Sequence, residues 1–410
     1  MIVLKKIVQY NLIGNMIIRE RYIDKIRPFY ESDLVKVIVG IRRCGKSVIL
    51  NQIMDEISKK TDNIIYLNFE KTADWMKASN AEQLVAYVGE HRKTGKCYLF
   101  FDEIQELSGW EMAIKDFRLG NNSVFITGSN SKLLSHDITT RLSGRYVKFQ
   151  VRPFIYSEIA ECLKEYGREA SINDYLIWGG FPGRFALDNI EAQKAYLSDL
   201  EETIIYKDLV KRYRIRKDAI FKKIVNFVLC NNSRILSSRS IARYVNAECG
   251  PISLNTVMKF IEYLKEAYII DDVPQYSTKS KRELAYYQKL YDADVCFNSL
   301  SKDDNRFDLD HNLENIVYNE LLYRGYKLRV YDNNGKEIDF RAVKDGKEYF
   351  IQVAYSLVDQ KAYEREFSAF EGLSSLSKMI IISNDENDYS TASVKHIRLR
   401  DFLVMEDFGF

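Results

Sequence analysis

The sequence has few of the residues that build metal centres and disulfide frameworks. Its 410 residues include four histidines and six cysteines, and no two cysteines form a C-x-x-C pair. This composition argues against a zinc site or a disulfide framework, and it predicts a reduced, cytoplasmic protein. No apolar run reaches the 18 residues of a membrane-spanning helix, and the first ten residues lack the apolar core of a signal peptide. We therefore expect no membrane partner.

An excess of charge of one sign is also missing. Lysine and arginine number 60, against 58 aspartates and glutamates. A net charge of +2 does not by itself indicate binding to nucleic acid, so any basic surface must come from local clustering. A chain of this length is expected to divide into two or three domains, each with its own core.

The most specific motif that is present is G-x-x-x-x-G-K-[ST], which residues 40–47 match as GIRRCGKS, directly after an apolar run. Glycines let the backbone fold around phosphates, so that N–H groups and the next helix's N-terminus point at the anion. Lys46 is expected to reach the β- and γ-phosphates, and the Ser47 hydroxyl to ligate Mg²⁺. The predicted nucleotide contacts in this segment are Gly40, Arg42, Arg43, Cys44, Gly45, Lys46, Ser47 and Val48.

A second apolar run, 97–101, ends in Asp102-Glu103. A carboxylate at the carboxyl end of a strand lies where open α/β sheets place their ligand chemistry. We expect Asp102 to hold Mg²⁺ and Glu103 to orient or deprotonate the attacking water, which together predict nucleotide hydrolysis. Residues 127–130 close a later strand with polar groups, where Ser129 is a candidate sensor of the γ-phosphate; a plain turn is the alternative.

Strand-like runs alternate with helical patterns in the first part of the chain, which predicts βαβ units and a mostly parallel sheet. The expected strands are 35–39, 64–69, 98–101, 123–127 and 146–151, and the expected helices are 47–59, 81–93 and 110–119. We predict an α/β fold with three domains. A doubly wound parallel sheet forms 1–157, a helical and winged-helix domain forms 158–302, and a small α/β domain forms 303–410.

Arg141 and Arg145 lie between the fourth and fifth predicted strands. In ring-forming ATPases an arginine at this position projects into the neighbouring subunit's nucleotide, where it stabilises charge on the transferring phosphoryl group. Both residues are therefore candidate catalytic arginines. A surface salt bridge is the equally open alternative for each.

Two features of the middle region are typical of DNA binding. Residues 207–223 contain eight basic side chains with Tyr206 and Tyr213 interleaved, a stripe that would track a phosphate backbone, although such runs are usually solvated helix faces. Residues 237–270 read as helix, turn and helix, followed by strand-like runs that flank Lys279, Lys281 and Arg282. This order predicts a winged helix. Its second helix would present Asn255, Thr256 and Lys259 to DNA, unless the module binds protein instead.

The last hundred residues follow the order α-β-β-β-α-β: helix 313–323, strands 327–331, 338–343 and 349–353, helix 360–370 and strand 379–382. With these elements in place, nearly the whole chain resembles archaeal and bacterial AAA-type P-loop ATPases that carry a winged helix and a C-terminal restriction-endonuclease-like domain of unknown function. The marks of the resemblance are the loop 40–47, Asp102-Glu103-Ile104-Gln105 followed by Trp110, Thr127-Gly128-Ser129, Gly144-Arg145, Gly180-Phe181-Pro182, Lys207-Asp208, Glu314-Asn315 and Glu337-Ile338-Asp339-Phe340.

The resemblance implies a nucleotide-dependent machine that assembles as a homo-oligomeric ring, a hexamer, and acts on DNA, in some relatives on branched DNA such as Holliday junctions. It also implies a nuclease-type Mg²⁺ site, built from two carboxylates and an E-x-K triplet. Glu314 and Asp339 match the two carboxylates, whereas Gln352-Val353-Ala354 replaces the triplet. Gln352 remains a candidate oxygen ligand, and Arg365 or Glu366 is a candidate replacement. The simpler interpretation is a degenerate nuclease that keeps Glu314 and Asp339 as a vestigial metal site.

We therefore expect an Mg²⁺-dependent ATPase that moves on or remodels DNA. ATP is favoured over GTP because no guanine-reading N-K-x-D tetrad occurs. Two alternatives stay open: a nucleotide-gated interaction or signalling switch that hydrolyses ATP slowly, and an ATP-regulated nuclease.

Overall fold

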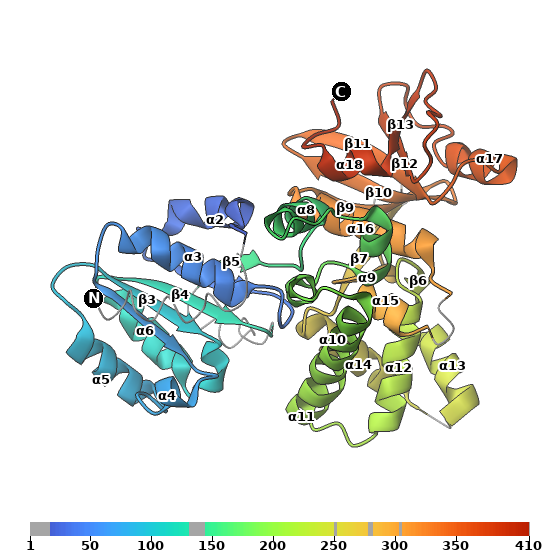
Figure 1. Ribbon diagram of the computed structural model, residues 1–410. Coiled ribbons are helices and arrows are strands. Elements are labelled where there is room, and N and C mark those ends of the chain that lie inside the picture. The colour runs from blue at the N-terminus through green and yellow to red at the C-terminus, as the bar shows by residue number, and fades with distance from the viewer. Residues whose placement is uncertain (1–16, 131–143, 250–251, 278–281, 303–305, 410) are drawn as a thin grey trace. The chain divides into compact units, whose positions relative to one another are not determined.

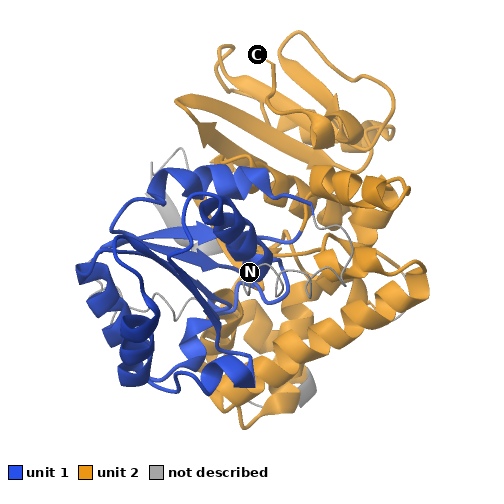
Figure 2. Cartoon of the chain, turned by 60° about the vertical axis from the view of Figure 1, so that its left-hand side comes forward, with its two compact units in different colours: residues 1–153, 266–268 blue, residues 154–265, 269–410 orange. Residues whose placement is uncertain are grey.

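A computed structural model describes residues 17–130, 144–249, 252–277, 282–302 and 306–409. The chain forms two compact units (Figure 2): unit 1 comprises the residues up to 153 together with 266–268, and unit 2 comprises 154–265 and 269–410. Within the described ranges, no helix is both long enough and apolar enough to cross a membrane.

Unit 1 is built on a five-stranded parallel sheet in the order β2-β3-β4-β1-β5. Every residue of β1, β3 and β4 is buried, as expected for parallel strands covered on both faces. In Figure 1, α2 and α3 cover one face of the sheet and α5 and α6 cover the other. The strands are β1 (Val35–Val39), β2 (Ile64–Asn68), β3 (Cys97–Asp102), β4 (Asn122–Gly128) and β5 (Tyr146–Gln150); the helices are α2 (Glu20–Ile26), α3 (Lys46–Ser58), α4 (Thr72–Trp75), α5 (Ala81–His91) and α6 (Trp110–Leu119).

This architecture confirms the predicted α/β fold with a parallel sheet. All five expected strands and all three expected helices are present, with ends that differ by two residues at most. Helices α2 and α4, seven and four residues long, were not expected from the sequence. Helices this short carry too little periodic pattern to be recognised from sequence alone.

Unit 2 begins with helices and ends in an eight-stranded sheet of order β13-β12-β11-β10-β9-β7-β8-β6. A π-helical segment, Glu202–Asp208, lies between α10 and α11. The helices are α8 (Tyr156–Glu165), α9 (Ile172–Trp178), α10 (Ile190–Glu201), α11 (Leu209–Tyr213), α12 (Asp218–Cys230), α13 (Ser238–Cys249), α14 (Leu254–Glu266), α15 (Cys296–Leu300), α16 (Leu309–Tyr323), α17 (Gln360–Ser368) and α18 (Leu399–Val404). The strands are β6 (Ile235–Leu236), β7 (Ile270–Ser277), β8 (Arg282–Asp292), β9 (Lys327–Asn333), β10 (Lys336–Lys344), β11 (Lys347–Ala354), β12 (Lys378–Ser383) and β13 (Val394–Arg398).

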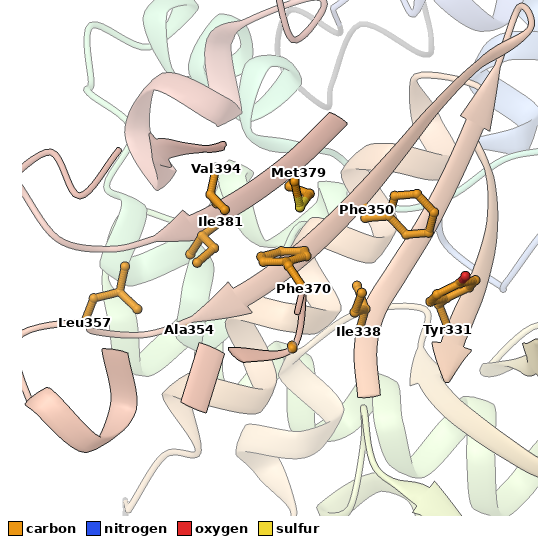
Figure 3. Packing of buried hydrophobic residues seen from close by; sticks show 10 residues of the cluster. Tyr331, Ile338, Phe350, Ala354, Leu357, Phe370, Met379, Ile381 and Val394 are labelled. Carbon is orange, nitrogen blue, oxygen red and sulfur yellow. The ribbon is translucent and has the colours of Figure 1, made fainter. Parts of the chain in front are cut away.

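The predicted order α-β-β-β-α-β is found in α16, β9, β10, β11, α17 and β12, and β13 and α18 extend it. A cluster of buried apolar side chains lies on one face of these strands (Figure 3). Phe370, just after α17, packs there with Ile338, Phe350 and Ile381 from three different strands. This cluster fixes α17 and the turn after it to the sheet.

The residues assigned above to two separate domains, 158–302 and 303–410, share one sheet in the structure. Strand β7, from the predicted winged helix, pairs in parallel with β9 through Gln275–Val330, Tyr276–Tyr331 and Ser277–Asp332. The structure therefore groups these regions in one compact unit, and it places the division from unit 1 at Pro153 and Phe154.

Buried asparagines join α16 to β8 and α9, and α15 to the residues that follow α12. Asn315 on α16 accepts a hydrogen bond from the Asp292 N–H at 2.7 Å and donates to the Asp292 carbonyl at 2.8 Å. Its amide thus pairs with the end of β8 as a neighbouring strand would. Asn312 donates to the Leu176 carbonyl at 2.9 Å, and Asn298 donates to Asn232 at 2.9 Å. Because buried amides need partners, these bonds fix which helices pack together.

Strand β1 carries a lysine in the core of unit 1. Lys36 has no exposed surface, and its Nζ donates to Ser123 Oγ at 2.8 Å and to the Ser32 carbonyl at 3.2 Å. The same Nζ lies 4.6 Å from the centre of the Phe125 ring. Burial lowers the pKa of Lys36 to about 7, and the nearby charge of Lys96 adds to this shift.

We expect the free energy of unfolding of the wild-type protein to rise between pH 7 and pH 10. Lys36 titrates near 7 in the folded chain and near 10.5 when unfolded, so the unfolded chain binds more protons in this window. Raising the pH therefore favours folding; below pH 7 both states are protonated and this gain is absent. Lys36→Met should remove a rise on the order of a few kcal/mol.

Urea titrations at several pH values test this expectation. Lys115→Met, at an exposed position of α6, is the matched control and should keep the wild-type slope. Equal pH slopes for Lys36→Met and the wild type would contradict the assignment.

Candidate functional site

The predicted phosphate loop connects β1 to α3. Gly40 and Gly45 have φ values of +150° and +100°, which favour glycine. A Cβ atom on Gly40 would lie 2.1 Å from the Val151 carbonyl oxygen, so no larger residue fits there. The first turn of α3 therefore begins directly behind a tight, glycine-dependent loop, as the motif predicts.

Lys46 extends along the inside of this loop. Its Nζ lies 3.1 Å from each of the Gly40 and Ile41 carbonyl oxygens and 3.6 Å from Glu103 Oε1. The side chain is 3% exposed. A cation held this way at the N-terminus of a helix provides positive charge where a phosphate would bind.

Asp102, at the end of β3, accepts hydrogen bonds from several neighbours. Its Oδ1 accepts from Ser47 Oγ at 3.1 Å and from Thr127 Oγ1 at 2.5 Å, and its Oδ2 accepts from Asn68 Nδ2 at 2.9 Å. Burial raises the pKa of the Asp102 carboxyl, and the bonds from Thr127 and Ser47 oppose that shift. The Thr127 hydroxyl is thus used to bind the Asp102 carboxylate.

The Ser47–Asp102 pair fits the magnesium ion that such a loop implies. A hydroxyl and a carboxylate lie within hydrogen-bond distance of each other beside the loop. Mg²⁺ prefers oxygen ligands and takes most of the others from water and phosphate. Ser47 and Asp102 are therefore the residues that would hold it.

Glu103 directly follows Asp102 and has a left-handed backbone, with φ of +50°. Its N–H donates to Thr127 Oγ1 at 2.9 Å, and its Oε2 accepts from the Ser129 N–H at 3.2 Å and from the side-chain amide of Gln105. Burial works against ionisation, but the charge of Lys46 and the bond from Gln105 outweigh it and hold the pKa of Glu103 below its usual value. Glu103 is therefore held in one orientation as an ionised carboxylate.

The other predicted nucleotide contacts differ in exposure and in the partners of their side chains. Arg42 pairs with Glu70 at 2.8 Å, and Arg43 is exposed. Cys44 is fully buried and its thiol donates to the Val151 carbonyl at 3.4 Å, so only its backbone faces the loop. Val48 is half-buried in the first turn of α3.

Arg19 and Asn68 escaped the sequence analysis because neither belongs to a motif. Arg19 is 1% exposed; its Nη1 donates to the Cys44 carbonyl at 2.9 Å and to the Arg152 carbonyl at 3.0 Å. It therefore ties the phosphate loop to the segment that follows β5. Asn68 ends β2 opposite Asp102, and this adjacency is visible only once the strand order is known.

Of the two candidate catalytic arginines, the structure describes only Arg145. Arg141 lies outside the described residues. Arg145 precedes β5, whose first residue pairs with Val35 at the start of β1. It therefore lies at the amino edge of the sheet, about 16 Å of strand away from the phosphate loop. Arg145 does not contribute to the nucleotide site of its own chain.

The basic segment 207–223 is spread over the π-helical segment, α11 and α12. All eight basic side chains except Arg212 are exposed. The interleaved tyrosines already have partners within the chain. The Tyr213 ring stacks on the Tyr263 ring with their centres 3.6 Å apart, and the Tyr206 hydroxyl donates to Asn226 Oδ1 at 2.6 Å.

The predicted helix–turn–helix is present as α13 and α14, with Asn255 and Lys259 exposed and Thr256 half-buried. Lys279 and Lys281 fall outside the described residues.

The two nuclease-type carboxylates do come together. Glu314 on α16 and Asp339 on β10 both contact Lys289, a residue of β8 that the sequence analysis did not select. Burial would lower the pKa of Lys289, but Asp339, Glu314 and Glu337 outweigh it and hold this pKa well above its usual value. Gln352 bonds to Glu366 at 2.6 Å, and Arg365 pairs with Glu366.

Comparison with known families identifies two segments of the chain. Residues 32–160 match the family described as AAA domain, and residues 169–303 match a domain of unknown function, DUF8612. An uncharacterized protein of Haemophilus influenzae is 31% identical over 351 residues, which cover 83% of this chain and 88% of that protein. An uncharacterized protein of Methanocaldococcus jannaschii is 32% identical over 382 residues, covering 86% and 82%.

Solved structures give looser matches. Cdc6p of Pyrobaculum aerophilum matches with a TM-score of 0.30 and 11% identity, covering 70% of this chain and 93% of that one. The Orc1 protein of Aeropyrum pernix, in complex with DNA, gives 0.31 and 12% over 71% and 94%. AMPPCP-bound DnaA of Aquifex aeolicus gives 0.33 and 17% over 62% and 90%. Overlays this loose do not support conclusions about function.

The matched AAA domain spans the parallel sheet, the phosphate loop and the Asp102-Glu103 pair, and the two relatives extend over more than four fifths of the chain. We conclude that the chain belongs to the family of AAA-type P-loop ATPases.

Proposed function

We propose that this protein is an Mg²⁺-dependent ATP hydrolase that assembles into a homo-oligomeric ring and remodels DNA. The convergence of Lys46, Ser47, Asp102 and Glu103 at one edge of the parallel sheet is the observation that carries the hydrolase assignment. These four side chains are the groups that phosphoryl transfer to water requires of a protein.

Each residue has a distinct role in this proposal. Lys46 leaves the Gly40 and Ile41 carbonyls to bind the β- and γ-phosphates, and Ser47 and Asp102 hold the metal. Glu103 orients the attacking water and accepts its proton at a carboxylate oxygen. Bound Mg²⁺ supplies a positive charge that offsets the charge on the phosphates. Thr127 and Asn68 keep Asp102 in place through their hydrogen bonds.

The arginine that completes the site comes from a neighbouring subunit in this proposal. Arg145 lies at the sheet edge opposite its own phosphate loop, where an arginine is available to a second copy of the chain. A hexameric ring would repeat this arrangement at each interface. A guanidinium at the transferring phosphoryl group is worth about 10³-fold or more in rate.

DNA is the proposed partner because unit 2 presents exposed lysines and arginines in segment 207–223 and exposed polar groups on α14. Since Tyr206 and Tyr213 are engaged within the chain, this segment offers charge and no free aromatic surface. Binding would therefore follow the phosphate backbone, with little sequence preference and a strong dependence on salt.

Glu103→Gln should bind ATP normally and hydrolyse it slowly, because only the proton-accepting group is lost. We expect turnover to fall on the order of 10²- to 10⁴-fold, with ATP retained on the purified protein. Lys46→Ala should lose nucleotide binding instead. Glu106→Gln, an exposed glutamate three residues away, is the matched control. Wild-type turnover in Glu103→Gln would show that Glu103 is not the base.

ATP turnover should rise when duplex, single-stranded or branched DNA is added. Steady-state assays at two salt concentrations measure this effect. The double change Arg216→Glu and Lys217→Glu removes two exposed cations and should lower DNA affinity at least tenfold. Lys115→Glu in unit 1 should have no such effect. Turnover that ignores all three kinds of DNA would refute the DNA role and leave the hydrolase assignment standing.

Arg145→Ala should abolish hydrolysis without weakening ATP binding. Mixing it with Lys46→Ala should restore part of the activity, because some interfaces then combine an intact loop with an intact arginine. Light scattering with and without ATP and DNA would report the size of the assembly. Mixed oligomers that form but stay inactive would place the catalytic arginine elsewhere.

A further inference from the structure

Three carboxylates of unit 2 converge on a single buried ammonium. Lys289 Nζ lies 2.9 Å from Glu314 Oε1, 2.8 Å from Asp339 Oδ1 and 2.7 Å from Glu337 Oε1. An ammonium has three N–H donors, and three carboxylate oxygens lie here at the distance of a strong hydrogen bond. The lysine side chain is only 4% exposed, so water does not compete for it.

The lysine reaches this position from outside the α-β-β-β-α-β core. Lys289 and Tyr291 lie two residues apart on β8 and therefore on the same face, and both donate to Glu314 Oε1. In the sheet order, β7 and β9 separate β8 from β10. The β7–β9 pairing covers three residue pairs, Gln275–Val330, Tyr276–Tyr331 and Ser277–Asp332.

The groups that would ligate a divalent metal are engaged otherwise. Asp339 Oδ1 binds Lys289, and Asp339 Oδ2 accepts from the Val353 N–H at 2.9 Å. Gln352 Oε1 accepts from the Asp339 N–H at 3.1 Å, and Gln352 Nε2 donates to Glu366 at 2.6 Å. Among the described residues, no group of three or more histidine, cysteine, aspartate and glutamate side chains is arranged to hold a metal ion.

The nuclease-type metal implied by the family resemblance therefore does not fit this site. A divalent ion would have to displace an ammonium that is buried, hydrogen-bonded to Glu314 and Asp339 and paired with Glu337. Until it did so, the two positive charges would repel each other within a few ångströms. The arrangement also differs from a nuclease that has merely lost its lysine, because the site contains a lysine from another strand.

We infer that Lys289 is the permanent cation of this site, that it takes the place of the divalent metal, and that the C-terminal region therefore does not cleave phosphodiesters. Its role is to join β8 to α16 and β10 through one buried charge cluster. DNA handling by unit 2, if it occurs, is then limited to binding.

Removing the ammonium should uncover a metal site. In Lys289→Ala, Glu314, Glu337 and Asp339 lose their counter-charge, and we expect the melting temperature to fall by about 10 °C. Mn²⁺ should bind in the vacated space and restore part of that loss. The matched control is Lys395→Ala, because the Lys395 ammonium donates to the Phe408 carbonyl at 2.7 Å.

The test is a Mn²⁺ titration of the full chain without nucleotide, read by electron paramagnetic resonance and by thermal unfolding. The wild type and Lys395→Ala should show no Mn²⁺ site that depends on Asp339, so Asp339→Ala should leave Mn²⁺ binding unchanged. Lys289→Ala, in contrast, should bind Mn²⁺ at least tenfold more tightly than the wild type. Wild-type plasmid incubations with Mg²⁺ or Mn²⁺ should leave supercoiled DNA intact.

A wild-type Mn²⁺ site that Asp339→Ala abolishes, or plasmid nicking lost in the same variant, would overturn the inference. So would a folded Lys289→Ala that binds Mn²⁺ no better than the wild type. If Lys289→Ala does not fold, Lys289→Gln keeps most of the side-chain volume and is read in its place. If neither folds, the two wild-type measurements decide.

Discussion

A carboxylate that is taken out of water needs donors to replace the water, and this requirement organises both units. In unit 1, Asp102 is surrounded by Ser47, Thr127 and Asn68, which leaves it held in one orientation at the edge of the sheet. In unit 2, Glu314 and Asp339 meet the same need with Lys289 and backbone or hydroxyl donors. Neutral donors leave Asp102 with its charge, whereas a buried lysine offsets the charge at the second cluster. We therefore propose that these similar acidic pairs have opposite capacities for metal.

The sequence was sufficient to bring the candidate site residues together because they lie at the ends of parallel strands. Once β1, β3 and β4 are assigned, Lys46, Asp102 and Ser129 must meet at one edge of the sheet. Arg19 and Lys289 could not be found this way. Their partners Cys44 and Asp339 lie 25 and 50 residues along the chain, and no periodic pattern connects them. Single long-range contacts leave no signal in one sequence.

The division of the chain was harder to predict than its elements. The predicted domain boundary lies between residues 302 and 303, yet the amides of Asn312 and Asn315 on the next helix bond back to Leu176 and Asp292. Aspartate and asparagine are common in loops, and residues 303–305 read Asp-Asp-Asn, so composition alone favoured a boundary there. Inside α16, in contrast, asparagine side chains attach the helix to earlier segments of the chain. A buried amide needs hydrogen-bond partners, and the segment that packs against it has to provide them.

The sharing of one sheet by β7, β8 and β9–β13 has a consequence for synthesis on the ribosome. In unit 1, β2 pairs with β3 and β3 with β4, whereas β1 pairs with β4 and β5, which are made later. In unit 2, Lys289 has to wait for Asp339. At 5–20 residues per second, those 50 residues take about 3–10 s. At the start of this interval helices such as α9 have been made, but α16, whose Asn312 bonds to Leu176, has not. The chain thus completes most of its nucleotide-binding unit while the rest of the molecule still depends on residues that have not been added.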